Sequence, residues 1–214
     1  KKGELVALIG PNGSGKSTLL KLSSGILSPL EGEVRVFGNL ISKYSPKERA
    51  SLVSYLPQII DTDVSFTVRE IASMGQYHGK NTGLTIEAAL SITGLSDKAQ
   101  RKVFELSGGE RRRAFLAMML VQGAKTLLLD EPLTNLDIKY QLELINLIKK
   151  MTEMKNSSAI VAIHDINLTR QFKKVCVMKD GKIKKIGSPR EVLTDDLIKE
   201  VFEVSPLDLY GHKG

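Results

Sequence analysis

The expected fold is decided by one stretch of the chain, Gly10-Pro11-Asn12-Gly13-Ser14-Gly15-Lys16-Ser17. It satisfies the pattern G-x-x-x-x-G-K-[S/T] at every position. An apolar segment, residues 4–10, precedes it and predicts a buried strand, and residues 18–27 continue it with a helical pattern. Glycines let the backbone curl so that successive N–H groups point inward, and together with a helix N-terminus they bind anions. We therefore expect a phosphate-binding loop, with Lys16 reaching the phosphates and the Ser17 hydroxyl on Mg²⁺.

A second apolar segment, residues 125–130, ends in two adjacent carboxylates, Asp130 and Glu131. A buried strand beneath the phosphate loop would direct Asp130 toward Mg²⁺. Glu131, one residue further on, could then polarise an attacking water as a general base. An Asp-Glu-Pro sequence is also an ordinary exit from a strand, but its pairing with the phosphate loop favours the catalytic interpretation.

The composition excludes several classes of protein. In 214 residues, 42% are hydrophobic and 26% charged, which excludes collagen-like, low-complexity and wholly disordered chains. No apolar run approaches the length of a membrane span, and the N-terminus lacks a cleavable signal pattern. The single cysteine, Cys176, cannot form an internal disulfide, so we expect a reducing compartment. The net charge of +7 permits an anionic partner, but scattered lysine pairs favour a solvated surface.

The order of the predicted elements is α/β, interrupted by a mostly helical stretch at residues 68–120. Asp180-Gly181 predicts a hairpin turn. Further strands are expected at 33–37, 52–56, 158–163, 175–179 and 182–186, helices at 45–51, 110–121, 138–154, 168–173 and 189–203, and a polar loop at 75–85. We expect a P-loop NTPase core with an inserted helical subdomain. The chain is one domain, with the core at 1–67 and 122–214 and the helical subdomain at 68–121.

Four further motifs follow the phosphate loop in a fixed order. They are Gln58, then Leu106-Ser107-Gly108-Gly109-Glu110 at the start of a helix, then Thr134-Asn135-Leu136-Asp137, then His164. Ser107 lies 23 positions before Asp130. With the phosphate loop and the Asp130-Glu131 pair, this set resembles the ATP-binding subunits of ABC transporters, and the resemblance covers essentially the whole chain.

The resemblance implies a role for each motif. Gln58 is similar to the lid glutamine that reaches Mg²⁺ and senses the transmembrane partner, although an isolated glutamine after a strand can be a surface residue. Ser107, Gly108 and Gly109 resemble the donors that grip the γ-phosphate of ATP held by the opposite subunit, and the alternative is a plain capping turn. Asp137 resembles the residue that couples the two sites, and it is also a possible helix N-cap. His164 resembles the switch histidine at the γ-phosphate, and its alternative role is structural.

The resemblance also implies the chemistry and the assembly. ATP and Mg²⁺ would be the cofactors, and the chain would be an ATPase coupled to transport. A head-to-tail dimer would sandwich two ATP molecules and act on permease subunits at the cytoplasmic face of the membrane, with no nucleic acid partner. The implied sets are catalytic Glu131, His164, Lys16 and Gln58; ATP-binding Gly10, Pro11, Asn12, Gly13, Ser14, Gly15, Lys16, Ser17 and Thr18; trans ATP-binding Ser107, Gly108, Gly109 and Asp137; and metal-binding Ser17, Gln58 and Asp130.

Three features of the sequence depart from the family pattern. Glu110 stands where glutamine is usual, and Leu133 where threonine is common. The family stacks adenine on an aromatic residue upstream of the phosphate loop, but none of the 15 residues before Lys16 is aromatic. We therefore expect the first strands of the family to be missing from this chain. The polar loop at 75–85 is also short for the family.

Four segments resemble the ATP-binding subunits of importers of iron-siderophores, haem or cobalamin. They are residues 66–70, 74–78, 136–143 and 201–204. Zinc or manganese importers stay open as close relatives, and Tyr77 and His78 could be ordinary surface residues. A soluble ABC ATPase acting on ribosomes or nucleic acid is a further alternative that the positive charge permits. A catalytically inactive regulatory module is disfavoured, because its expected catalytic residues are intact: Lys16, Asp130, Glu131 and His164.

Overall fold

A six-stranded sheet forms the centre of the protein in the computed structural model, which describes residues 3–59, 65–79 and 83–203. The strand order is β4-β5-β6-β1-β7-β8. The first five strands are parallel to their neighbours, and β8 is antiparallel to β7 at the edge. The predicted α/β architecture is therefore confirmed. The strands are β1 (Leu5–Ile9), β4 (Val53–Leu56), β5 (Thr126–Asp130), β6 (Ser158–Ala162), β7 (Lys174–Lys179) and β8 (Lys182–Gly187).

The register of the parallel strands aligns their carboxyl ends. Leu8 of β1 and Asp130 of β5 both pair with Ala162 of β6, and Leu56 of β4 pairs with Leu129 of β5. The chain therefore leaves four neighbouring strands at one edge of the sheet. Parallel α/β sheets bind ligands outside this edge.

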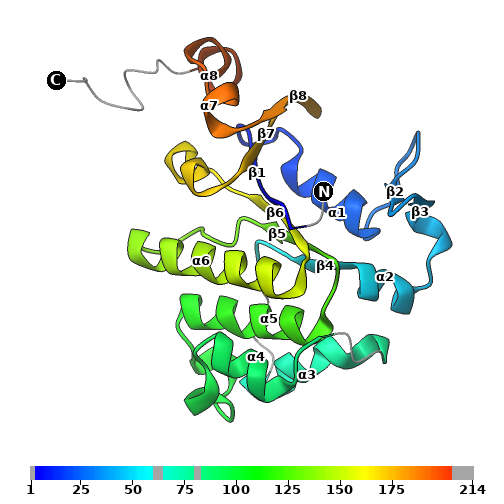
Figure 1. Cartoon of the computed structure of the whole chain (residues 1–214), viewed down its shortest axis with the longest axis vertical. Coiled ribbons are helices and arrows are strands. Elements are labelled where there is room, and N and C mark those ends of the chain that lie inside the picture. The colour runs from blue at the N-terminus through cyan, green and yellow to red at the C-terminus, as the bar shows by residue number, and fades with distance from the viewer. Residues whose placement is uncertain (1–2, 60–64, 80–82, 204–214) are drawn as a thin grey trace.

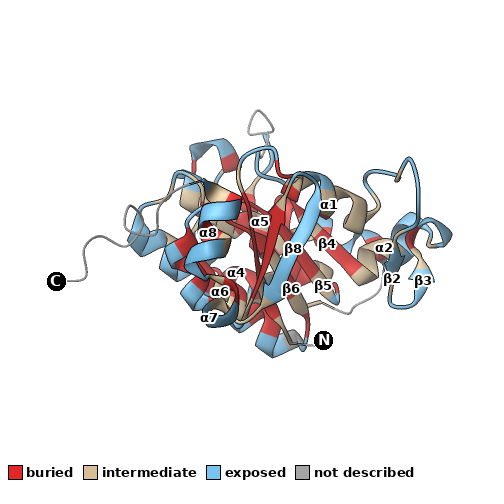
Figure 2. Ribbon diagram, turned by 90° about the horizontal axis from the view of Figure 1, so that it is seen from above, coloured by how far each residue is buried: buried red, intermediate tan, exposed pale blue. Residues whose placement is uncertain are grey.

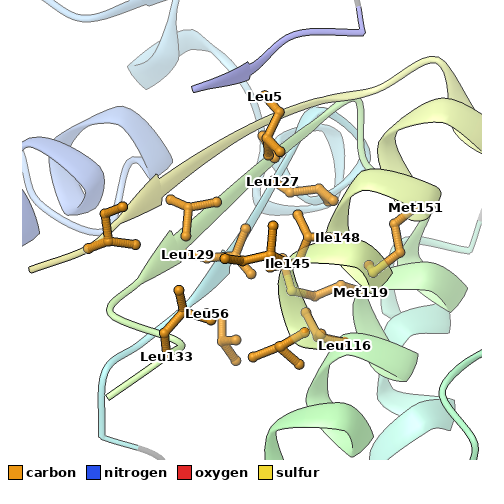
Figure 3. Close-up of a cluster of buried hydrophobic side chains, with 14 of the residues drawn as sticks. Leu5, Leu56, Leu116, Met119, Leu127, Leu129, Leu133, Ile145, Ile148 and Met151 are labelled. Atoms are coloured by element: carbon orange, nitrogen blue, oxygen red, sulfur yellow. The ribbon is translucent and has the colours of Figure 1, made fainter. Parts of the chain in front are cut away.

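Alternate residues of the strands face two separate cores. On one face, Leu8, Leu128 and Met178 pack around Leu20 of α1 (Lys16–Ser24). The opposite face supplies the larger core, where side chains of the strands meet those of α5 (Gly108–Gln122) and α6 (Ile138–Lys155) (Figure 3). Buried residues concentrate in the central strands and in the helix faces turned toward them (Figure 2). Strands buried on both faces read as continuous apolar runs, which is the pattern that predicted them.

Helix boundaries follow local capping chemistry. Ser107 and Glu110 form a reciprocal capping box at the start of α5, and Thr67 and Glu70 form another at α3. Gly25 and Gly123 end α1 and α5 in the left-handed conformation. The other α-helices are α2 (Pro46–Leu52), α3 (Val68–Ser73), α4 (Ile86–Ile92), α7 (Pro189–Val192) and α8 (Asp195–Phe202).

Three helical elements pack against α5 on the side away from the sheet. They are α3, α4 and the 3₁₀ helix η2 (Met74–His78), and Figure 1 shows α3 and α4 beyond α5. In the opposite direction α5 contacts β4 and α6. The inserted helices therefore lie where the sequence expects them, and the division of the chain at residues 67 and 122 stays a prediction. Within the described ranges, no helix is both long and apolar enough to cross a bilayer.

Several predicted elements differ from the structure. Instead of one strand at 33–37 there is a small hairpin, β2 (Arg35–Val36) and β3 (Asn39–Leu40), because Phe37 and Gly38 turn the chain with positive φ. The expected helix at 168–173 is a 3₁₀ helix, Ile166–Gln171, capped by the Asp165 carboxylate. The expected helix at 189–203 is divided into α7 and α8, because Thr194 caps a new helix.

The polar loop expected at 75–85 is also wrong in part. Residues 74–78 form η2, Thr85 caps α4, and residues 80–82 lie outside the described ranges. A Cβ at Gly75 would lie 2.3 Å from Met118 O, and one at Gly83 would lie 1.7 Å from Val121 O. These glycines therefore allow close packing on α5, which is a different requirement from loop flexibility.

Two isoleucines of α6 give a matched test of the core. Ile145 is 1% exposed and Ile138 is 71% exposed. Ile145→Ala should lower the free energy of unfolding by about 2–5 kcal/mol, because it leaves a cavity beneath the sheet. Ile138→Ala should change it by no more than about 0.5 kcal/mol. Urea unfolding followed by circular dichroism measures both, and equal costs would contradict this assignment of the core.

Candidate active site

The phosphate loop joins β1 to α1, as predicted. Gly10 is required by a close approach, since a Cβ there would lie 2.3 Å from Met178 O and 2.7 Å from Ser14 Oγ. Gly15 caps α1 with a φ of 95°, a left-handed conformation that favours glycine. The first N–H groups of α1 have no partners within the helix, so they are free to bind an anion.

The phosphate loop contains groups that fit a phosphate, and the ammonium of Lys16 is bound to backbone carbonyls of the same loop. Lys16 is 5% exposed, and its Nζ donates to Gly10 O at 2.8 Å and to Pro11 O at 3.1 Å. Burial lowers the pKa of this ammonium, and the Glu131 and Asp130 carboxylates act in the opposite direction. Ser14 Oγ is buried and has no hydrogen-bond partner in the described part of the chain. A buried hydroxyl without a partner and an ammonium bound only to carbonyls both fit a phosphate ligand.

Asp130 is buried at the end of β5 and accepts a hydroxyl on each carboxylate oxygen. Ser17 Oγ donates to Oδ1 at 3.0 Å, and the Tyr55 hydroxyl donates to Oδ2 at 3.0 Å. Burial and the nearby Asp130 charge raise the pKa of Tyr55, so its hydroxyl remains a donor. The hydroxyl of Ser17 and the carboxylate of Asp130 together present the hard oxygen ligands that Mg²⁺ prefers. Tyr55 was not predicted, because nothing in a strand sequence shows which side chain reaches the next strand.

Glu131 lies beside Asp130 and is held by two other motifs. Gln58 Nε2 donates to Oε2 at 2.5 Å, and His164 Nε2 lies 2.5 Å from Oε1. Glu131 is 6% exposed and has a φ of 50°, which is unusual for a residue other than glycine. Such backbone conformations cluster at functional sites. Two side chains that follow β4 and β6 thus converge on the carboxylate that follows β5.

The Ser107–Gly109 segment forms the exposed first turn of α5. Ser107 Oγ accepts the Glu110 backbone N–H at 3.3 Å and donates to Glu110 Oε2 at 3.0 Å. Ser107 and Gly108 are exposed, and a Cβ on Gly109 would lie 3.6 Å from the Leu136 side chain. The capping alternative is therefore real, but it leaves the turn open to solvent and to a ligand.

Glu110, the departure from the family pattern, has a second partner that the sequence did not reveal. It forms an ion pair with Lys98 of the 3₁₀ helix Ser96–Lys98. The Lys98 hydrogen bond, followed by the Ser107 backbone N–H, lowers the pKa of the Glu110 carboxyl to about 2. The acid thus ties the first turn of α5 to the helices packed against it.

Asp137 occupies the N-cap position of α6, and its side chain makes no capping hydrogen bond within the described residues. It is exposed, as are its neighbours Ile138 and Lys139. The pure capping role that the sequence left open is therefore not seen, and the carboxylate is accessible to a partner.

The predicted residues fall into two groups. The first consists of residues joined by contacts at the carboxyl edge of the sheet, namely Lys16, Ser17, Gln58, Asp130, Glu131 and His164. The second is the exposed turn Ser107–Gly109 with the nearby Leu136-Asp137 segment. Among the described residues no hydrogen bond or ion pair that we find joins the two groups. The predicted site residues therefore lie at two separate places on one chain.

Comparison with known proteins decides the family. Residues 1–134 match the family described as ABC transporter. The chain belongs to the ABC transporter family. The petrobactin import ATP-binding protein FpuC of Bacillus anthracis is 39% identical over 95% of this chain and 78% of its own length. The hemin import ATP-binding protein HmuV of Rhodopseudomonas palustris is 41% identical over 95% of this chain and 81% of its own. A cobalamin import ATP-binding protein, BtuD of Halobacterium salinarum, is 35% identical over 95% of this chain and 53% of its own.

Solved structures agree with the fold. An inward-facing putative metal-chelate type ABC transporter matches with a TM-score of 0.81 and 27% identity, over 96% of this chain and 81% of its own. The dimeric ABC transporter cassette MJ0796 matches with a TM-score of 0.78 and 27% identity, over 89% of this chain and 87% of its own length. The expected ABC ATPase fold, ATP as ligand and the ATPase class are thereby confirmed at the level of the family. Mg²⁺ and the individual roles of the site residues stay predictions.

The Lys98–Glu110 pair predicts a pH dependence of stability. Because folding lowers the pKa of Glu110 to about 2, its contribution is present above the unfolded pKa of about 4.3 and is lost as pH falls toward 2. Glu110→Gln should cost about 1 kcal/mol of unfolding free energy at pH 7, and less below pH of about 3. Urea titrations at several pH values measure this, with the exposed Glu153→Gln as the control. A cost that does not change with pH would contradict the assignment.

Proposed function

We propose that this chain is the ATP-hydrolysing motor subunit of an importer for an iron-siderophore, haem or cobalamin. The observation that carries the proposal is the Glu131 carboxylate held by Gln58 and His164 beside the phosphate loop. An orphaned hydroxyl and a buried ammonium in that loop support nucleotide binding. The import role is supported by relatives whose names specify petrobactin, hemin and cobalamin import.

Glu131 would act as the general base. A carboxylate has about four lone-pair sites, so one hydrogen bond on each oxygen leaves capacity to accept a proton from water. The bonds from Gln58 and His164 fix its orientation, which is most of what a general base requires beyond its basicity. His164 is half exposed at the mouth of the site, where its ring would also meet the γ-phosphate.

Charge stabilisation would fall to the phosphate loop and to Asp130. Lys16 would exchange the carbonyls of Gly10 and Pro11 for phosphate oxygens, which are stronger partners for an ammonium. The N–H groups of the loop and of α1 would bind the remaining oxygens. Ser17 and Asp130, with the free amide oxygen of Gln58, are the residues that would hold Mg²⁺. The metal would supply neutralisation of the phosphate charge.

The second group of residues would complete the site of another copy. Ser107 and Gly108 are exposed at a helix N-terminus, where the helix dipole favours an anion. Ser107 would turn its hydroxyl from Glu110 to the γ-phosphate of the partner, while Asp137 would contact the opposite site. A head-to-tail pair with two ATP molecules satisfies both groups, and the dimeric form of the similar cassette supports it.

The inserted helices, residues 68–121, would face the permease at the cytoplasmic side of the membrane. Exposed apolar side chains occur in and beside this region, at Phe66, Met74, Tyr77 and Phe104, and are available to a protein partner. Gln58 is close in sequence to this region and contacts Glu131, so it could relay the state of the permease to the base.

Glu131→Gln tests the catalytic role. The amide keeps the size of the side chain but cannot take a proton, so ATP turnover should fall by at least about 100-fold while ATP binding is retained. Light scattering should then show a mass of two chains with ATP and Mg²⁺, and of one chain without nucleotide. Glu153→Gln, at an exposed position near the C-terminal end of α6, is the control. A variant that stays monomeric at saturating ATP, or hydrolyses at the wild-type rate, would count against this role.

The transport role is tested by isolating tagged protein from detergent-solubilised native membranes and identifying its partners by mass spectrometry. We expect a permease with many transmembrane helices, whose identity would also separate an iron-chelate importer from a zinc or manganese importer. Ribosomal proteins or nucleic acid without a permease would instead favour a soluble ABC ATPase.

A further inference from the structure

Asp130 has a partner that no motif of the sequence assigns. The hydroxyl of Tyr55, on β4, donates a hydrogen bond to Asp130 Oδ2 at 3.0 Å, and Ser17 Oγ donates one to Oδ1 at 3.0 Å. Tyr55 pairs with Leu128 in the β4–β5 ladder, so its ring extends two residues along β5 to reach the carboxylate. Each oxygen of Asp130 is therefore fixed by a different element.

The packing around Tyr55 makes this contact rigid. Tyr55 packs against the buried cluster that includes Leu20, Val53 and Leu128, on the face of the sheet that α1 covers. Asp130 itself is 2% exposed, so water has little access to compete for Oδ2. A buried hydrogen bond to a charged group is among the stronger contacts in a protein, and it sets geometry as well as energy.

We propose that Tyr55 is a positioning residue for the metal-binding carboxylate, which it locks with Oδ1 toward Ser17. The inference rests on the proposed function, because it assumes that Ser17 and Asp130 hold Mg²⁺. Without the phenol hydroxyl, Oδ2 would lose its donor and the carboxylate could rotate about its χ2 angle. Ser17 and Asp130 would then be aligned only part of the time, and metal affinity would fall.

The test is Tyr55→Phe, which removes one oxygen and keeps the ring. With a non-hydrolysable ATP analogue, the dissociation constant for Mn²⁺, measured by electron paramagnetic resonance, should rise about tenfold, as expected for one charge-assisted hydrogen bond. The Mg²⁺ concentration that half-activates ATP hydrolysis should rise by a similar factor. The turnover at saturating Mg²⁺ should stay within about twofold of wild type, because Asp130 keeps its charge.

Tyr44→Phe is the matched control. The Tyr44 hydroxyl also donates a hydrogen bond, to Val36 O at 3.1 Å, but it lies by the β2–β3 hairpin. The Mn²⁺ affinity of the Tyr44→Phe variant should equal that of wild type. Binding of the analogue without metal should be the same in both variants, which also shows that each is folded.

An unchanged Mn²⁺ affinity in folded Tyr55→Phe would overturn the positioning role. A loss of turnover at saturating Mg²⁺ with unchanged metal affinity would overturn it too, since that split indicates a part in chemistry and not in metal alignment. Failure of the proposed function is distinguishable from both results, because wild-type protein would then show no Mg²⁺-dependent ATP hydrolysis.

Discussion

The parallel pairing of β4, β5, β6 and β1 is the constraint on which the rest of the structure depends. Parallel strands end at the same edge, so residues 10, 58, 130 and 164 meet there despite their separation in sequence. A shift of one residue in any pair would turn the exit side chains to the other face of the sheet. Mostly apolar strands between two helical layers hold this register, because most of their side chains are buried against one layer or the other.

The site at that edge contains two buried carboxylates whose charges are compensated by hydrogen bonds and a nearby ammonium. Asp130 and Glu131 are adjacent, almost fully buried and of like charge, which is costly without partners. The hydroxyls of Ser17 and Tyr55 satisfy one carboxylate, and Gln58 and His164 satisfy the other. Lys16 supplies the nearby positive charge. These contacts hold the groups in place before any nucleotide binds, so little reorganisation is needed when it does.

Local chemistry explains which parts were predictable from the sequence. The phosphate loop, the strand ending at Asp130 and the helix start at the Leu106–Glu110 motif are each complete within a few residues, and each was placed correctly. The β2–β3 hairpin was not predicted, because it requires a positive φ at Phe37, which is unusual for this residue type. The Tyr55–Asp130 and Lys98–Glu110 contacts were missed since they join elements far apart in the chain or across a helix. Gly75 and Gly83 were taken for loop residues, although their close packing on α5 is a tertiary property.

The proposed ATP site is divided between two places on one chain, which no hydrogen bond or ion pair joins within the described residues. The account therefore depends on a second copy, in which the exposed turn at Ser107 and Gly108 meets the phosphate loop of its partner. In such a pair, hydrolysis would depend on the association of two chains, and loss of the γ-phosphate would remove a shared ligand and let the pair open.

The most direct measurement is cross-linking between single-cysteine variants in a Cys176→Ala, Glu131→Gln background. Asn12→Cys and Gly108→Cys are both exposed positions, one in the phosphate loop and one in the α5 turn. With a short bismaleimide, the account predicts ATP-dependent dimers when the two variants are mixed, and none from either variant alone. Dimers from like variants, or no ATP-dependent dimer in the mixture, would contradict the head-to-tail pair.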